Sequence, residues 1–587
     1  VRSGRSLPMT KTMMIPDAWS QKRSMPQAHK DLYGYANAVM EPWDGPAGIA
    51  AFGGQWVLAG MDRNGLRPLR YTVTGDGVLI VGSEAGMVRV DESQVKEKGR
   101  IGPGQMIAVN LEEGRLYHDR KLKDLLAAQV PFTEWVKNIT EIDSLITSGT
   151  VAPTEFSRAE LRRRQLAYGW SLEDLEMILQ PMGEDGKEAI GSMGDDTPVA
   201  VLSNKYRGLH HFFRQNFSQV TNPPIDSLRE RRVMTLNTRL GNLGNILDTD
   251  EGQCKLLQLT SPVLLNAEFD AMRAYMDDTA VEIDCTFDAK SAEAGNALAL
   301  REALTRIQQE AETAVRGGCT HVILSDKAVS PERATVPMIL AAGGVHTHLT
   351  RQALRTFTSL NVRTGECLDV HYFGVLIGVG ATTVNAYLAE ESLAERHARG
   401  LFGDAGLETV LRRYKKAVDD GLLKIMSKMG IGVLSSYRGG CNFEAVGLSR
   451  ALVADFFPGM PSRVSGIGLP GIQHKVMEIH RAAWDEDVIR LPFGGFYRYR
   501  AGSETHAFEG MQIHMMQAAV GTDSYSTFRK YSEAVRSMPP IHLRDLWDFE
   551  TTRAPVSIDE VESITQIRKR FVTGAMSHGA LSREAHE

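Results

Sequence analysis

Cysteine is scarce in this chain of 587 residues. Its five cysteines lie far apart and form no C-x-x-C pair; they are Cys254, Cys285, Cys319, Cys367 and Cys441. Structural zinc sites and disulfide frameworks both need clustered or paired cysteines. The pattern argues against either one and is typical of the reducing cytoplasm. We therefore expect a cytoplasmic protein in which this chain forms no metal site.

The sequence indicates neither a basic surface nor a membrane-spanning segment. Its formal net charge is -6 with no basic patch, which argues against nucleic acid as a partner. The stretch 371–388 is uncharged but mixes glycine and threonine with apolar residues, so it fits a buried strand that turns into a helix. Residues 1–6 are polar and basic, and no apolar segment follows them. We expect no signal peptide and no membrane association.

Composition is otherwise that of an ordinary globular protein. Hydrophobic residues make up 43% of the chain and charged residues 24%, so each part can bury a core. A length of 587 residues predicts about three or four domains. We therefore expect a multidomain enzyme rather than a single module.

The stretch 57–71 contains the most distinctive turn. Two apolar runs flank the segment D-R-N-G-L-R-P (62–68). Asn and Gly tolerate the positive φ of tight turns, so the pattern predicts a β-hairpin. Asp62 and Arg67 bracket the turn with opposite charges. We expect them to form an ion pair that supports the fold and takes no part in chemistry.

This segment resembles the D-x-x-G-x-R-P motif of class II glutamine amidotransferases. Apolar runs at 47–52, 78–83 and 101–107 surround it in that family's order, which implies part of an N-terminal-nucleophile (Ntn) hydrolase αββα sandwich. The family attacks glutamine with an N-terminal cysteine whose α-amine acts as the base. Residue 1 is Val, so we expect no catalytic residue in this sequence and no activity from the isolated chain.

A second distinctive segment, 183–230, contains S-M-G-D-D-T-P and F-S-Q-V-T-N-P-P-I-D. Asp195 and Asp196 are a candidate metal pair, although acidic residues before a strand more often cap a turn. A group of aromatic residues could contact nucleic acid, but helical spacing and little basic charge favour core packing. These residues are Tyr206, Phe212, Phe213 and Phe217. As a whole, the segment resembles the central domain of glutamate synthases.

Two helices are predicted at 159–168 and 171–179, and Pro181 ends the second. After them, strands and helices alternate through the middle of the chain. Alternation predicts parallel strands covered by helices, as in an α/β sheet or an incomplete barrel. The predicted strands are 320–325, 336–342 and 370–378, and the predicted helices are 294–316, 349–360 and 405–429.

Two features of this middle part are candidates for binding sites. Glycines at 343–344, 378–380 and 439–440 could hold a phosphate, but none forms a G-x-G-x-x-G or P-loop motif, so tight strand-to-helix turns are favoured. His346 and His348 would point the same way from a strand, but no third metal ligand lies near them in the sequence. We therefore expect no metal here.

The last distinctive segment, F-V-T-G-A-M-S (571–577), follows a helix start at 557–560. It resembles the opening of the flavin-binding (β/α)8 barrel of glutamate synthases, whose first strand ends in G-A-M-S. Functional residues of such barrels lie at the carboxyl ends of the strands. The resemblance implies that Ala575, Met576 and Ser577 contact FMN in the whole enzyme, although we expect the chain alone to bind none.

The resemblance to the glutamate synthase family extends from about residue 4 to residue 587. It implies the end of an amidotransferase domain at 1–147, the central domain at 148–508 and the start of the flavin barrel at 509–587. Such enzymes hydrolyse glutamine, pass ammonia through an internal tunnel and reductively aminate 2-oxoglutarate at FMN. A 3Fe-4S cluster delivers electrons from an NADPH-oxidising FAD subunit or from ferredoxin.

Two alternatives stand beside this interpretation. Another class II amidotransferase, of the purine type, would need a strand that runs into an acidic pair, whereas Asp195 and Asp196 precede the predicted strand at 199–202. A non-catalytic scaffold is the other alternative, because no complete active site is evident in the sequence.

Overall fold

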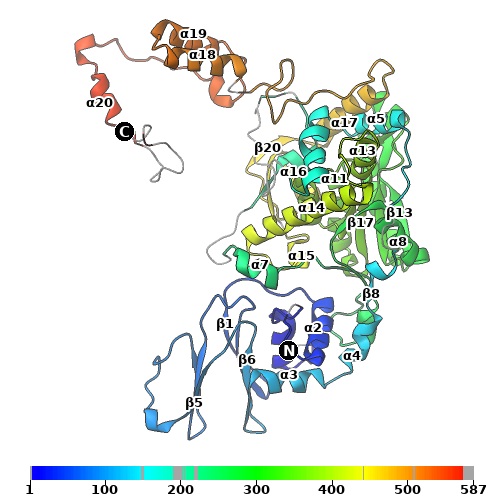
Figure 1. The fold of residues 1–587 in the computed structure, drawn as a ribbon, viewed down its shortest axis with the longest axis vertical. Coiled ribbons are helices and arrows are strands. Elements are labelled where there is room, and N and C mark those ends of the chain that lie inside the picture. The colour runs from blue at the N-terminus through cyan, green and yellow to red at the C-terminus, as the bar shows by residue number, and fades with distance from the viewer. Residues whose placement is uncertain are drawn as a thin grey trace. The chain divides into compact units, whose positions relative to one another are not determined.

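The computed structural model describes residues 3–20, 22–146, 151–188, 202–203, 205–216, 223–440, 442–506, 509–572 and 583. The chain divides into two compact units. Unit 1 consists of Val1–Pro198 with Asn204–Glu504, and unit 2 of Val199–Ser203 with Thr505–Glu587. The elements of both units are drawn in Figure 1.

The N-terminal part of unit 1 contains two antiparallel sheets, blue in Figure 1. Their strands are β1 (Gly48–Gly53), β2 (Trp56–Met61), β3 (Arg70–Thr74), β4 (Leu79–Gly82), β5 (Val95–Arg100), β6 (Met106–Asn110) and β7 (Arg115–Tyr117). The first sheet has the order β1-β2-β6-β7 and the second the order β4-β3-β5. Both contain only antiparallel pairs.

Helices cover one face of the first sheet, and the second sheet covers the other. Successive residues of a strand point to opposite faces. Leu58 and Met106 therefore pack in a core with the helices, whereas Ala59 and Ile107 pack in a core with residues next to the second sheet. The result is a layer of helices and two layers of sheet. The helices are α1 (Leu7–Met14), α2 (Gln27–Val39), α3 (Asp119–Ala127) and α4 (Phe132–Trp135).

The predicted hairpin at 57–71 is wrong. β2 pairs with β1 and β6, whereas β3 pairs with β4 and β5. The turn itself is present, with Gly65 at φ 68°, but the segment carries the chain from one sheet to the other. Turn residues specify a local change of direction, and the strand partners are chosen by the sheets that the rest of the chain supplies.

A five-stranded parallel sheet forms the centre of unit 1. Its order is β12-β18-β17-β15-β13, and every pair is parallel, which confirms the predicted α/β arrangement. The strands are β12 (Val263–Leu264), β13 (Ala280–Asp284), β15 (His321–Ser325), β17 (Ser359–Arg363) and β18 (Thr383–Asn385).

Helices cover both faces of this sheet. Ile323 of β15 packs in a core with Phe269 and Met272 of α8, while Val322 and Leu324 join the core that contains the crossover helices. The longer helices of this part of unit 1 are α8 (Asn266–Met276), α10 (Ala299–Arg316), α11 (Met338–Arg351), α12 (Val370–Gly378), α13 (Tyr387–Ala398), α14 (Leu407–Met429), α16 (Arg450–Phe456) and α17 (Leu469–Trp484).

Smaller sheets complete unit 1. One has the order β10-β11-β8, one has the order β20-β19-β9, and β14 pairs with β16. Their strands are β8 (Thr140–Glu141), β9 (Phe213–Gln215), β10 (Thr238–Leu240), β11 (Leu257–Leu259), β14 (Thr286–Asp288), β16 (Arg333–Thr335), β19 (Phe443–Leu448) and β20 (Val464–Ile467).

Several predicted elements of the middle part have the other secondary structure. The segment 336–342 leads into α11 and 370–378 is α12, although strands were predicted at both; 349–360, predicted as a helix, ends α11 and begins β17. α11 and α12 are buried over nearly all their residues, so they lack the polar face that reveals a helix in a sequence. The glycines at 343–344 consequently lie inside a helix rather than in a turn.

The helical region after residue 157 also differs from its prediction in one place. α5 (Arg158–Ala167) ends before Gly169, which has φ 72°, as predicted. A π-helical turn (Asp174–Leu179) then continues directly into α6 (Gln180–Asp185), so Pro181 does not end the helix. Pro181 lacks an N–H and lies where the helix changes from π-helical to α-helical hydrogen bonding.

Unit 2 contains a pair of helices in close contact, α18 (Gly510–Gly521) and α19 (Tyr525–Arg536), and the short α20 (Ile564–Arg568). The strand and turn predicted at 571–577 lie outside the described residues from residue 573 onward. Within the part of the chain that the structure describes, no helix is long and apolar enough to cross a membrane.

Candidate functional site

The segment after β2 lies where the N-terminal sheets contact the rest of unit 1. Asp62 is 2% exposed, and its carboxylate accepts backbone N–H groups of Ala47, Asn64, Leu66 and Arg67 at 3.0–3.3 Å. The Arg67 side chain is exposed, and no ion pair joins it to Asp62 among the described residues. The predicted ion pair is therefore wrong, because backbone donors already satisfy the carboxylate.

Three hydrogen bonds tie this segment and its neighbours to the central part of unit 1. The Arg63 Nη2 atom donates to the Val233 carbonyl at 2.7 Å. The Arg229 Nε atom donates to the Asn64 carbonyl at 3.2 Å. The Gly432 N–H donates to the Asp44 carboxylate at 2.9 Å. We call this contact region the junction.

The junction contains buried polar atoms that lack a partner among the described residues. They are the Nε and Nη1 atoms of Arg63 and the side-chain oxygens Oδ1 of Asp44 and Asn64. Burial raises the pKa of Asp44, against the opposing charge of Arg63. Since buried polar groups are normally hydrogen-bonded, these atoms set the junction apart from an ordinary packed contact.

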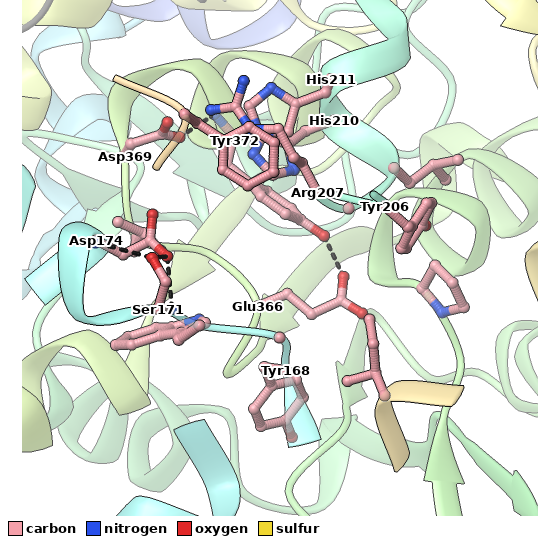
Figure 2. A pocket seen from close by; sticks show the side chains of 18 of the residues that line it. Tyr168, Ser171, Asp174, Tyr206, Arg207, His210, His211, Glu366, Asp369 and Tyr372 are labelled. Atoms are coloured by element: carbon pink, nitrogen blue, oxygen red, sulfur yellow. Dashed lines mark hydrogen bonds between the residues drawn. The ribbon is translucent and has the colours of Figure 1, made fainter. Parts of the chain in front are cut away.

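A second candidate site lies at the carboxyl edge of the parallel sheet, where α/β proteins commonly bind ligands. Asp326 follows β15 directly, and Thr364 and Glu366 follow β17. A cavity of about 100 Å³ lies next to them. Figure 2 shows Glu366 near its centre, Tyr372 above, Tyr168 below and Tyr206 to one side. We call it the central cavity.

Glu366 is the most perturbed acidic group in the central cavity. Its Oε2 atom accepts the Tyr372 hydroxyl and the Met338 N–H at 3.1 Å. Burial, together with the charge of Asp326, raises the pKa of Glu366 to about 7. Glu366 is therefore poised to gain or lose a proton near neutral pH.

Asp326, the acid whose charge acts on Glu366, is hydrogen-bonded to the turn after β17. Asp326 accepts the Thr364 hydroxyl at 2.5 Å and the Gly365 N–H at 3.1 Å. Burial raises its pKa to about 6. The Tyr168 hydroxyl donates to the Asp326 carbonyl at 3.0 Å and lies 2.8 Å from the Tyr387 hydroxyl. Hydrogen bonds therefore link Tyr168, which lines the cavity, to the residues beneath it.

The opposite side of the central cavity carries another acid and one arginine. Asp174 accepts the backbone N–H and hydroxyl of Ser171, each at 2.7 Å, and burial raises its pKa. The Arg207 guanidinium lies 4.1 Å from the centre of the Phe496 ring, a cation–π contact. Ser171, Asp174 and Arg207 are labelled around the cavity in Figure 2.

Family models match the chain in three consecutive parts. The match to class II glutamine amidotransferases covers residues 1–135, that to the glutamate synthase central domain covers 163–449, and that to the conserved region in glutamate synthase covers 506–587. The last two extend well beyond the amidotransferase part, which separates this chain from other class II amidotransferases.

Curated relatives match over the whole chain. It is 65% identical to the glutamate synthase [NADPH] large chain of Azospirillum brasilense and 38% identical to that of Bacillus subtilis. Each match covers 100% of this chain and 38% of the relative. The ferredoxin-dependent glutamate synthase 2 of Synechocystis is 38% identical, with 100% of this chain and 39% of that protein covered.

The chain belongs to the glutamate synthase family. It spans about 38% of the length of the curated relatives it matches. A solved structure of flavocytochrome b2 also matches 55% of this chain and 91% of its own, but 10% identity and a TM-score of 0.26 are too low for any structural argument.

Several predicted site residues of this chain lie elsewhere than expected. His346 and His348 lie on α11, where His346 Nδ1 is 3.1 Å from Arg355 Nε and His348 is 2.6 Å from Glu312. No group of three metal-binding side chains occurs within the described ranges. The candidate metal pair Asp195 and Asp196 lies outside those ranges.

The aromatic group is divided between core and cavity. Phe213 is fully buried and packs 5.2 Å from the Phe457 ring, as predicted, whereas Tyr206 lines the central cavity. Phe217 lies outside the described residues, as do the predicted flavin contacts Ala575, Met576 and Ser577.

Sequence reasoning missed Glu366. The signal was present, since a buried strand is followed by the turn T-G-E (364–366), and an acid placed after a parallel strand lies at the ligand-binding edge.

Proposed function

We propose that this chain is part of an enzyme that makes L-glutamate from L-glutamine and 2-oxoglutarate, with reducing equivalents from NADPH or ferredoxin. The three family matches in consecutive order support this proposal. So does the similarity to relatives named as NADPH-dependent and ferredoxin-dependent glutamate synthases. The reaction would serve ammonia assimilation in the cytoplasm.

We further propose domain boundaries at 1–147, 148–508 and 509–587, with an Ntn-hydrolase αββα sandwich first and a flavin barrel last. The helix, sheet, sheet layering of the N-terminal part supports the first assignment. In the whole enzyme, FMN would supply hydride to the aminated 2-oxoglutarate. We propose that Ala575, Met576 and Ser577 would lie beside it, and that electrons would reach it through a 3Fe-4S cluster from an FAD subunit or from ferredoxin; the family resemblance of the sequence supports both.

The junction is the observation that best supports a role for this chain in the whole reaction. One buried and two partly buried hydrogen bonds hold the amidotransferase part against the central part. Unpartnered donors and acceptors lie between them. A contact of this kind keeps two domains in one geometry and can pass a molecule as small as ammonia without admitting bulk water. We propose that the junction borders the ammonia path.

Substitution of Arg63 in the full-length enzyme tests this proposal. Arg63→Met removes the bond to the Val233 carbonyl and the buried unpartnered nitrogens. Ammonia should then leak, so that more glutamine is hydrolysed than glutamate is formed. Arg67→Met is the matched control, because Arg67 lies in the same loop but is exposed.

The measurement is the ratio of glutamine hydrolysed to glutamate formed, alongside glutamate synthesis from added ammonium. We expect the ratio to rise only for Arg63→Met, with ammonium-dependent synthesis unchanged. Equal ratios in both variants would contradict a role of the junction in ammonia transfer. Failure of the unaltered full-length protein to form glutamate would contradict the proposed function itself.

A further inference from the structure

The central cavity has no role in the function proposed above, yet it has the features of a built ligand site. It lies at the carboxyl edge of the parallel sheet, where Glu366, Leu368 and Asp369 after β17 line it. Its walls come from segments far apart in the sequence, including the end of α5, the loop at 206–211 and the loop at 496–497. Only the folded unit 1 brings these segments together.

One polar group in the cavity wall can accept a hydrogen bond from a ligand. The bonds to Glu366 from Tyr372 and Met338 both fall on Oε2. Its Oε1 atom accepts no hydrogen bond from the described residues, and Glu366 is more exposed than the residues on either side of it. Because Glu366 lines the cavity, this free oxygen is available to a donor there.

Another group in the wall can donate a hydrogen bond. Trp170 is 2% exposed and lines the cavity, and its indole N–H has no partner among the described residues. A buried donor without an acceptor costs free energy, and a ligand whose acceptor atom reached this N–H would relieve that cost. Donor and acceptor in one small cavity favour a ligand that carries both kinds of group.

The charges and rings of the cavity favour a ligand with a cationic end. Glu366, Asp174 and Asp369 line it together with Arg207, His210 and His211, so three acids face one permanently charged base and two histidines. Aromatic rings form much of its wall and stabilise cations through their faces; they belong to Tyr168, Trp170, Tyr206, Tyr372, Phe496 and Tyr497. Arg207 and the Trp170 N–H are hydrogen-bond donors, which suit an anionic end of the same ligand.

We propose that the central cavity binds a small zwitterionic α-amino acid. Its ammonium group would contact Glu366 between the tyrosine rings, and its carboxylate would accept from Trp170 and Arg207. The cavity volume of about 100 Å³ is smaller than the roughly 150 Å³ that holds benzene. The small volume favours the smallest amino acids, glycine and alanine, over glutamine and glutamate.

Titration of L-alanine into the full-length protein, followed by calorimetry, tests the proposal. We expect a dissociation constant on the order of 1 mM, which is reasonable for six heavy atoms. Glu366→Gln should weaken binding about tenfold or more, and Trp170→Phe about threefold or more. Acetate and methylammonium, which each carry one end of the ligand, should bind more weakly than alanine.

Two control variants match these substitutions outside the cavity. Trp484 also has a buried indole N–H without a partner among the described residues, and Glu390 also has a pKa raised to about 7 by burial. Neither lines the cavity. Trp484→Phe and Glu390→Gln should leave alanine binding unchanged, and thermal melting of each variant identifies any loss of folding.

Absence of alanine binding up to about 50 mM, an affinity too weak for a built site, would overturn the proposal. So would equal losses in the cavity variants and their controls, or acetate binding as tight as that of alanine. If Glu366→Gln fails to fold, Trp170→Phe alone decides. Glutamate formation from glutamine, assayed without alanine, reports separately on the proposed function.

Discussion

At the scale of single residues, Asp62 and Arg67 contribute unequally to stability, although their charges predicted an ion pair between them. Asp62 is buried and accepts four different backbone N–H groups, while Arg67 is exposed. We predict that Asp62→Ala lowers the free energy of unfolding by about 2 to 4 kcal/mol, because several buried donors lose their acceptor. Arg67→Ala should change it by less than about 0.5 kcal/mol.

Denaturant unfolding of both variants measures this difference. Asp62→Asn is a useful intermediate, since it keeps an acceptor oxygen but not the charge. An Arg67→Ala variant as destabilised as Asp62→Ala would show that the charge pair forms after all.

At the scale of elements, α11 is packed closely enough that one of its glycines has no room for a methyl group. A Cβ on Gly343 would lie 2.4 Å from the Phe457 ring and 3.2 Å from the Phe456 carbonyl. We predict that Gly343→Ala lowers the free energy of unfolding by about 2 to 4 kcal/mol, because α11 and the end of α16 must separate.

Gly374 in α12 provides the control for this prediction. A Cβ there would meet its nearest neighbours at 3.5 Å and 3.6 Å, which are ordinary contacts. Gly374→Ala should be neutral or stabilising by up to about 1 kcal/mol, since alanine favours helices. Thermal melting compares the two, and similar losses in both variants would rule out the close helix contact as the cause.

At the scale of the whole molecule, buried ionisable groups make opposing contributions to the dependence of stability on pH. Burial raises the pKa of Glu390 from 4.5 to about 7. Between these pH values Glu390 therefore keeps its proton in the folded protein but releases it in the unfolded protein. Its contribution is lost as the pH rises through this window. Burial lowers the pKa of His321 to about 4, which gives a gain in stability as the pH rises from about 4 to 6.5.

We therefore expect the effect of Glu390 on the pH dependence of stability to be visible in the difference between a variant and the unaltered protein, because other groups mask it in the unaltered protein alone. Glu390→Gln keeps an acceptor for the Asn266 N–H, which lies 2.7 Å from Oε2, and removes the titration. Relative to the unaltered protein, the variant should gain about 1 to 3 kcal/mol in stability between pH 5 and pH 8. Denaturant unfolding at both pH values measures this gain, and a constant difference would contradict the raised pKa.

The sequence by itself determined the family and the broad architecture. Its motif segments occur in one order, and they are local strings that need no partner to be recognised. It also determined α10 and α14, because both have one apolar and one polar face, and β15, because its buried run is short and flanked by loops. Periodicity is a local property, so it can be detected without knowledge of the fold.

Only the tertiary structure decided the features that depend on surroundings. α11 and α12 are helices within a core on all sides, which erases their periodicity. β2 and β3 belong to different sheets because other strands complete each one. The central cavity joins Trp170 to Glu366 across nearly two hundred positions. Each of these depends on which distant residues exclude water together, and no short stretch of sequence carries that information.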